Sequence, residues 1–210
     1  KNNFIKLICC PPHTLIHSMS KKLKNSPINV GAQNCHENEN HGPFTGSVNA
    51  KMLKNVGAKF VIIGHSENRS RGENNKLINI KIKNSLKAGL KVIFCIGETS
   101  NEKRKKITKQ VLSKQISSGL NKIKNKNKII IAYEPVWSIG SGKIPKSEDL
   151  YDTINFIKNK LRNLKVVYGG SVNTNNINEL KLIDNIDGFL IGGASQDSKK
   201  FIDIIKKTYI

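Results

Sequence analysis

Short apolar segments alternate with helix-forming segments along nearly the whole chain, and this alternation constrains the fold more than any other feature. Seven segments are predicted to be strands: residues 6–10, 29–32, 60–63, 92–96, 129–132, 166–168 and 189–191. The segments between them are predicted to be helices: residues 14–23, 48–56, 75–88, 102–123, 148–161, 174–182 and 198–207. Gly57 and Gly89 stand where helices are expected to end. The alternation predicts an α/β fold with a parallel sheet that is covered on both faces.

The number of units points to a particular α/β architecture. Eight βα units close a parallel sheet into a (β/α)8 barrel, whereas seven leave two unpaired edges. Such barrels take about 250 residues, and this chain has 210. Because it begins with Lys1 rather than Met, and almost at a strand, we expect the eighth unit to be missing at the N-terminus. The sequence therefore predicts one barrel domain over residues 1–210 that is N-terminally incomplete, with seven of its eight units.

The strong positive charge raises the question of a nucleic-acid partner. The formal net charge is +21, and the chain has 36 basic residues. Four of them are arginines: Arg69, Arg71, Arg104 and Arg162. Arginine dominates phosphate and base recognition, yet here lysine prevails, scattered among many Asn and Ile residues in a pattern typical of an AT-rich genome. We therefore predict no specific nucleic-acid partner, although weak binding to polyanions, sensitive to salt, is expected.

Compartment and membrane association are also constrained by the sequence. The longest apolar runs are too short for a transmembrane helix, and the N-terminus does not resemble a signal peptide. The four cysteines lack zinc-ligand spacing and lie mostly in or beside apolar strands: Cys9, Cys10, Cys35 and Cys95. Thiols in such places are typical of reduced core residues, so we expect a cytoplasmic protein without a membrane partner.

A carboxylate follows one of the apolar strands and is followed in turn by a glycine-containing loop. Glu134 comes directly after residues 129–132, where a strand end can direct it into a pocket. The loop consists of Pro135, Val136, Trp137, Ser138, Ile139, Gly140, Ser141, Gly142 and Lys143. A loop with a stiff start and flexible glycines is typical of a mobile lid, here next to a candidate general base. Taken alone, the segment is equally compatible with a surface loop and an incidental Glu.

A histidine occupies a similar position after another strand. His65 follows residues 60–63, and a helix N-terminus nearby would lower its pKa and keep it neutral, able to donate a hydrogen bond to a carbonyl. The alternative is a structural histidine. His13 and His17 have the spacing of a metal pair but lack a third ligand, so no metal site is predicted.

Glycine pairs follow the last two predicted strands. Gly169-Gly170 precede Ser171, and Gly192-Gly193 follow residues 189–191. Backbone N–H groups at these two places of a barrel can converge on a phosphate. A base, a neutral imidazole, a phosphate cradle and a lid together favour proton abstraction next to a carbonyl, which needs neither a metal nor an organic cofactor.

The same segments resemble the triosephosphate isomerase family. The resemblance covers residues 31–34, 44–46, 62–67, 95–99, 132–143, 168–172 and 192–195, in the order of the family. It implies a TIM barrel that interconverts D-glyceraldehyde 3-phosphate and dihydroxyacetone phosphate through an enediolate, in glycolysis and gluconeogenesis. The family is itself the reference example of a Glu base, a neutral His and a closing lid.

The resemblance also assigns roles to residues. Glu134 would be the base and His65 the electrophile. Glu67 would be a buried carboxylate behind them, and Trp137 the aromatic residue of the lid hinge. The phosphate would be bound at Gly140, Ser171, Gly192 and Gly193. A homodimer through Phe44-Thr45-Gly46 is also implied.

The chain departs from the family in three places. The family's Asn-x-Lys after its first strand has no counterpart before residues 6–10. Ser47 and Asn68 replace an acidic and an arginine residue that pair across the family's dimer. Losing both avoids a stranded buried charge, so we expect a rewired dimer, with a monomer as the alternative. A different phosphate-binding barrel enzyme is a further alternative. An inactive barrel remnant with a binding or structural role is another, if the natural chain starts at Lys1.

Overall fold

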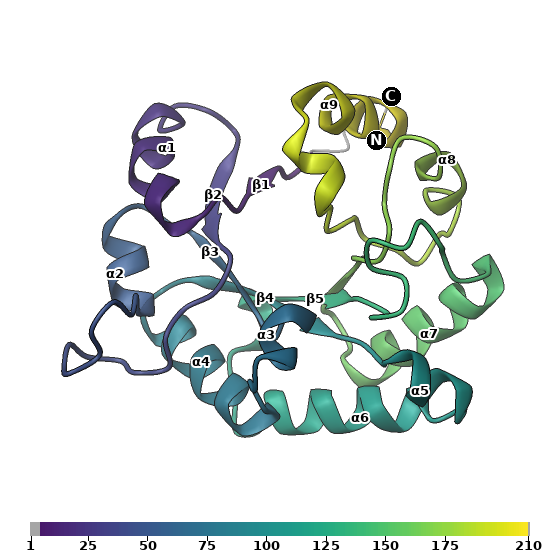
Figure 1. The fold of residues 1–210 in the computed structure, drawn as a ribbon, viewed down its shortest axis with the longest axis horizontal. Coiled ribbons are helices and arrows are strands. Elements are labelled where there is room, and N and C mark those ends of the chain that lie inside the picture. The colour runs from purple at the N-terminus through teal and green to yellow at the C-terminus, as the bar shows by residue number, and fades with distance from the viewer. Residues whose placement is uncertain (1–4, 210) are drawn as a thin grey trace. The chain divides into compact units, whose positions relative to one another are not determined.

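Strands and helices alternate along the chain in the computed structural model, which describes residues 5–209 (Figure 1). The six strands of the described residues are hydrogen bonded in chain order, from β1 to β6. Internal contacts divide the chain into two compact units. The N-terminal unit contains residues 5–95 and 115–130, and the C-terminal unit contains residues 96–114 and 131–209. That residues 1–210 form a single, N-terminally incomplete barrel domain stays a prediction.

The N-terminal unit is built on parallel strands. They are β1 (Ile8–Cys9), β2 (Asn29–Ala32), β3 (Phe60–Ile63) and most of β4 (Lys91–Ile96). The helices are η1 (His13–Leu15), α1 (Ile16–Lys22), α2 (Ala50–Asn55), α3 (Ser66–Ser70), α4 (Asn75–Lys87) and η2 (Lys126–Lys128). All of β3 is buried, and β4 is buried at every position after Lys91. Such continuous burial is what a parallel sheet covered on both faces requires.

Helix boundaries in this unit follow from local sequence. The side chain of Asn49 accepts the Met52 N–H at 3.0 Å at the start of α2, and Asn74 caps α4 in the same way. Gly57 and Gly89 then take φ values of +100° and +82° just after these helices. Glycine adopts this left-handed conformation without steric cost, so the predicted helix ends are confirmed.

The C-terminal unit contains the end of β5 (Ile129–Tyr133) and β6 (Lys165–Tyr168). Its helices are α5 (Ser100–Arg104), α7 (Ser147–Lys160), α8 (Ile177–Leu180), η3 (Gly193–Gln196) and α9 (Ser198–Tyr209), and α6 (Thr108–Gly119) begins in it. A capping box between Thr99 and Glu102 starts α5. Within residues 5–209, each helix is too short or too polar to cross a bilayer.

The prediction of a strand at residues 189–191 is wrong. Phe189 forms only an isolated parallel bridge with Tyr168, supported by a 2.9 Å bond from the Leu190 N–H to the Tyr168 carbonyl. The chain then turns at Gly192 and enters η3. The pairing stops because the glycine turn follows too soon for a ladder to extend.

The single helix predicted over residues 102–123 is also wrong, because α5 and α6 are separate helices. Lys106 lies between them with φ +56°. It is the last of four consecutive cations at residues 103–106. In a continuous helix Lys103 and Lys106 would be three residues apart on one face, and repulsion between their like charges disfavours that helix at this point.

Candidate active site

Glu134 lies directly after β5 and is 3% exposed. Its N–H donates to the Ile96 carbonyl at 2.8 Å. A Cβ on Gly97 would stand 1.8 Å from the Glu134 carbonyl oxygen, and a Cβ on Gly169 would stand 2.8 Å from Glu134 Cγ. No larger side chain fits without displacing backbone or the glutamate itself. The carboxylate is therefore held in place by the ends of two neighbouring strands.

The loop after Glu134 has the form expected of a lid. Pro135 and Pro145 are buried at its two ends, whereas residues 140–143 are exposed. Gly140 and Gly142 have φ values of +67° and +74°, as the sequence predicted. The loop thus has fixed ends and an exposed tip.

A buried carboxylate, Glu98, anchors the start of this lid, a role that its local sequence did not reveal. The Trp137 indole N–H donates to Glu98 at 2.9 Å, and the Tyr133 hydroxyl donates to the same carboxylate at 3.1 Å. Burial raises the pKa of Glu98, while its bond from Trp137 works in the opposite direction. Burial also raises the pKa of Tyr133 well above its ordinary value. Like Glu134, Glu98 comes just after a strand, and this position is the signal that could have identified it.

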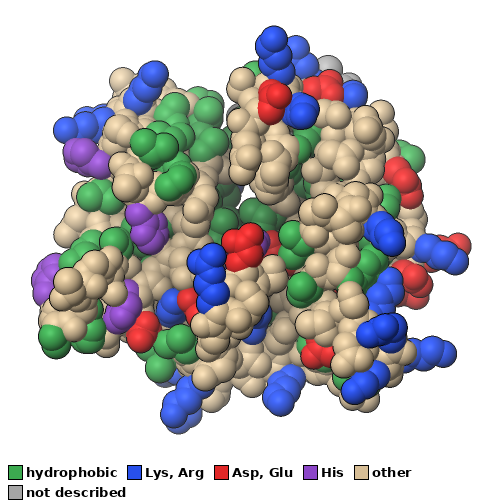
Figure 2. Space-filling model, in the orientation of Figure 1, with side chains coloured by type: hydrophobic (Ala, Val, Ile, Leu, Met, Phe, Trp, Pro, Cys, Tyr) green, Lys and Arg blue, Asp and Glu red, His purple; other side chains and the backbone are tan. Residues whose placement is uncertain are grey.

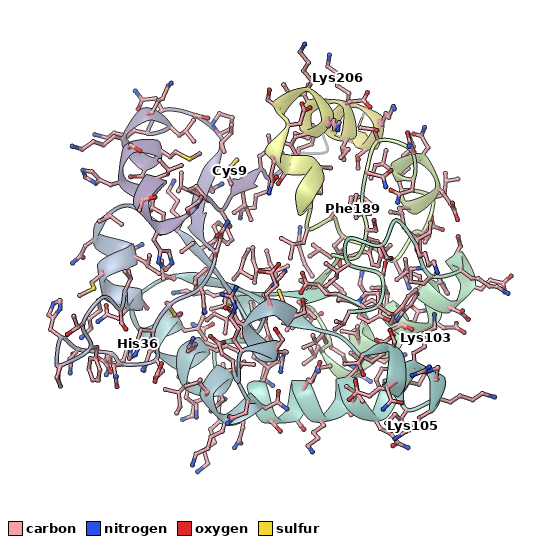
Figure 3. All side chains as sticks on the ribbon, viewed as in Figure 1. Cys9, His36, Lys103, Lys105, Phe189 and Lys206 are labelled. Carbon is pink, nitrogen blue, oxygen red and sulfur yellow. The ribbon has the colours of Figure 1, made fainter. Side chains whose placement is uncertain are left out.

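A lysine covers the other side of the lid tryptophan. Lys103 Nζ lies 3.4 Å from the centroid of the Trp137 ring, within the range of a cation–π contact. Figure 3 labels Lys103 on α5. No local pattern in the sequence predicts this contact, because it joins two segments 34 residues apart in numbering.

The middle of the lid is fastened by Ser138, which is fully buried. Its hydroxyl donates to the Lys143 carbonyl at 2.5 Å and lies 3.0 Å from the Tyr168 hydroxyl. Burial raises the pKa of Tyr168 to about 12, so this hydroxyl stays protonated at neutral pH. The lid is therefore tied both to itself and to the end of β6.

The residues expected to bind phosphate all belong to the C-terminal unit, together with Glu134. Ser171 follows β6, and Gly192 and Gly193 form the start of η3. Gly140, Gly192 and Gly193 are exposed, and nothing lies within 4 Å of a Cβ built on any of them. Their backbone is accessible to a small anion.

His65 lies at the end of β3 in the N-terminal unit and forms the N-cap of α3. Its Nδ1 accepts the Glu67 N–H at 3.4 Å, an arrangement that leaves the proton of a neutral ring on Nε2. Burial lowers the pKa of His65, while the charge of Glu67 opposes this shift. The His65 pKa is shifted downward, as the sequence predicted. The main cause is burial rather than the predicted helix N-terminus.

The expectation that Glu67 is buried is wrong. Its side chain is exposed, because Glu67 occupies the first turn of the short surface helix α3. A carboxylate there interacts favourably with the helix N-terminus and remains solvated.

Arg69 supports the turn that carries His65, a role the sequence did not reveal. It donates to the Gly64 carbonyl at 2.7 Å and to the Cys95 carbonyl at 3.1 Å. Gly64 has φ +79°. The guanidinium thus joins the ends of β3 and β4 next to the turn that carries His65.

The loop expected at a subunit interface projects its small residues outward. Thr45 and Gly46 are exposed, and the Phe44 ring packs 5.0 Å from the His36 ring, which Figure 3 labels. Ser47 and Asn68 are partly buried.

His13 and His17, which have the spacing of a metal pair, lie on the surface. His13 and His17 are exposed, and His13 Nε2 lies 2.9 Å from the Asn34 carbonyl. Across residues 5–209, no group of three or more His, Cys, Asp or Glu side chains is arranged to hold a metal ion.

Figure 2 shows Lys and Arg side chains dispersed over the visible face, with Asp and Glu among them.

Parallel strands with intervening helices, and polar residues that follow the carboxyl ends of individual strands, are typical of α/β-barrel enzymes. Residues 1–208 match the family model described as triosephosphate isomerase. The chain belongs to the triosephosphate isomerase family, and it is an isomerase with the TIM-barrel fold.

Relatives support this membership over most of their length. The chain is 43% identical to the triosephosphate isomerase of Thermodesulfovibrio yellowstonii over 205 residues, which cover 93% of this chain and 83% of the relative. It is 40% identical to the enzyme of Dictyoglomus thermophilum over 213 residues, 96% of this chain and 85% of the relative. The crystal structure of the Bartonella henselae triosephosphate isomerase superposes with a TM-score of 0.87 at 36% identity. That match covers 95% of this chain and 84% of the other.

Proposed function

We propose that this chain interconverts D-glyceraldehyde 3-phosphate and dihydroxyacetone phosphate, with Glu134 as the base and His65 as the electrophile. The observation that carries the proposal is the buried Glu134 at a strand end, confined by Gly97 and Gly169 and followed directly by the lid. A carboxylate held in this way is positioned to act on one carbon of a small substrate.

The proposed reaction moves only protons. Glu134 removes a proton from the carbon next to the substrate carbonyl, and the electron pair of that C–H bond forms the enediolate. The neutral His65 ring donates from Nε2 to the carbonyl oxygen and relays a proton between the two oxygens. Glu134 then returns its proton to the other carbon. One carbon is oxidised as its neighbour is reduced, so there is no net oxidation and the reaction requires no redox cofactor.

The phosphoryl group provides the binding energy for positioning. In the proposal it accepts hydrogen bonds from the backbone N–H groups of Gly140, Ser171, Gly192 and Gly193. Their accessible backbone in the C-terminal unit supports this assignment. Closure of the lid keeps water from the enediolate and prevents it from expelling phosphate.

We also propose a homodimer through Phe44-Thr45-Gly46 and a cytoplasmic location. The exposed Thr45 and Gly46 support the former. For the latter, the support is that all four cysteines are free thiols and that the reaction belongs to glycolysis.

The decisive experiment compares Glu134→Gln with the wild-type chain. We expect the variant to lose about 10²-fold to 10⁴-fold in kcat, because the amide cannot accept the proton. Deuterium uptake into the triose in D2O, followed by NMR, measures the proton transfer itself. Glu148→Gln, at an exposed position of α7, is the matched control and should keep full activity. An inactive wild-type chain would favour the barrel remnant, and full turnover by Glu134→Gln would refute the assigned base.

A further inference from the structure

The Ser138 hydroxyl contacts two residues outside the lid, Tyr168 and Ser171, in addition to Lys143 within it. The side chain has no exposed surface, and three polar groups surround its oxygen. They are the Lys143 carbonyl at 2.5 Å, the Tyr168 hydroxyl at 3.0 Å and the Ser171 backbone N–H at 3.3 Å. All of them belong to the C-terminal unit.

Counting protons fixes the direction of each bond. A serine hydroxyl has one proton to donate and two lone pairs to accept with. The Lys143 carbonyl can only accept, so it takes the Ser138 proton. The Tyr168 hydroxyl and the Ser171 N–H must then both donate to Ser138. The oxygen is saturated, and each lone pair has one occupant.

The Ser171 N–H is also one of the groups proposed to bind the substrate phosphoryl group. Such an N–H makes one good hydrogen bond at a time, so Ser138 and phosphate compete for it. At 3.3 Å the bond to Ser138 is longer than the 2.7–3.2 Å usual for N–H···O bonds, which makes it the weakest of the three and the easiest to replace.

We propose that Ser138 is a positioning residue whose hydroxyl occupies the Ser171 N–H in the ligand-free chain and is displaced by the substrate's phosphoryl group. This inference rests on the proposed function, because it requires phosphate at Ser171. Its consequence is a direct link between anion binding and the lid. When phosphate takes the Ser171 N–H, the middle of the lid loses one of its ties to the end of β6.

The test uses inorganic phosphate as the ligand and its dissociation constant as the readout. Ser138→Ala removes the competitor and leaves the N–H available. We expect the dissociation constant to fall about twofold to tenfold, which corresponds to the net contribution of one hydrogen bond. In the ligand-free variant, the amide proton signal of Ser171 should also shift in the NMR spectrum. Unchanged or weaker phosphate binding by Ser138→Ala would overturn the inference.

Two control variants separate this role from general loosening of the lid. Tyr168→Phe removes one bond from the same cluster but leaves the bond between Ser138 and Ser171 in place. It should therefore change the dissociation constant less than Ser138→Ala does, and an equal or larger fall would contradict the inference. Ser147→Ala, just beyond the lid at an exposed position, should bind phosphate like the wild type.

The wild-type titration separates a failure of the proposed phosphate site from a failure of the proposed role of Ser138. If the wild type does not bind phosphate, the proposed cradle fails, and the role of Ser138 fails with it. If the wild type binds and Ser138→Ala binds no tighter, only the role of Ser138 fails. Should Ser138→Ala not fold, the wild-type NMR signals decide. The amides of Ser138 and Ser171 must shift together on titration, and a shift of Ser171 alone would overturn the inference.

Discussion

The indole N–H of Trp137 donates a 2.9 Å hydrogen bond to the buried carboxylate of Glu98. The same carboxylate accepts the Tyr133 hydroxyl, so two donors share it. Trp137 is the single tryptophan of the chain. Its fluorescence therefore reports on the surroundings of one ring at the base of the lid, which include both Glu98 and Lys103.

Replacing Glu98 with Gln should loosen the lid base. The glutamine amide replaces one carboxylate oxygen with an NH2 group and carries no negative charge. Trp137 and Tyr133 then have to share one neutral oxygen, and both hydrogen bonds become weaker. We expect a loss of about 1–3 kcal/mol in unfolding free energy and a shift in Trp137 emission. Urea unfolding and fluorescence spectra measure the two effects. Glu148→Gln, at an exposed position, is the control. Unchanged emission in Glu98→Gln would contradict the assigned contact.

Removing the charge of Lys103 should weaken the stacking on Trp137. In Lys103→Met we expect a loss of about 0.5–1 kcal/mol, the size of an exposed cation–π contact, together with altered Trp137 emission. Lys105→Met is the matched control, because Lys105 is an exposed lysine two residues further along and not over the ring. Both lysines are labelled in Figure 3. Equal emission changes in the two variants would argue for a general charge effect.

Enlarging Gly97 should displace Glu134, the proposed base. An added methyl group would stand 1.8 Å from the Glu134 carbonyl oxygen, so the backbone has to shift. We expect Gly97→Ala to cost about 1–3 kcal/mol of stability and roughly 10²-fold in kcat, because small misplacements of reacting groups are costly. Steady-state kinetics together with thermal unfolding test this. Wild-type kcat in a folded Gly97→Ala variant would refute the tight approach.

The pH dependence of stability should carry a contribution from His65, whose pKa burial lowers. An unfolded histidine takes up a proton below about pH 6.5, whereas folded His65 does so only at lower pH. The unfolded state therefore binds more protons as the pH falls through this range, and the unfolding free energy decreases. We expect a lower urea midpoint at pH 5.5 than at pH 7.5, and a smaller difference in His65→Gln. His17→Gln, at an exposed position, should keep the wild-type difference. The same pH dependence in wild type and His65→Gln would contradict the expectation.

The proposed dimer predicts a response to charge at the exposed loop. Thr45→Arg should lower the mass measured by light scattering from that of a dimer toward that of a monomer, since a cation would be buried without a partner. Asn101→Arg, at an exposed position of α5, is the control. A wild-type chain that is monomeric at micromolar concentration would favour the monomer alternative. In that alternative, the neutral Ser47 and Asn68, which replace the family's paired acidic and arginine residues, no longer support the interface.

Some of the strands and helices predicted from the sequence agree with the structure, and others do not. β2 and β3 occupy the predicted residues because a short apolar run with adjacent turn signals leaves few other conformations. Residues 189–191 have the same apolar character, yet they form one bridge, because a strand also requires a partner along its length. The α5–α6 break was missed for a similar reason, since the helical periodicity continues across Lys106 although the backbone does not.

Local sequence was sufficient to identify the βα alternation, the helix-ending glycines, the lid with its left-handed Gly140 and Gly142, and Glu134 and His65 at their strand ends. Each of these depends on neighbours in the chain, through backbone stereochemistry or the spacing of apolar residues. The bond from Trp137 to the buried Glu98, the exposure of Glu67 and the bonds between Ser138 and the distant Tyr168 and Ser171 depend on the folded chain. They arise from contacts between segments about 30 residues or more apart, or from whether such contacts cover a side chain, and no local pattern contains that information.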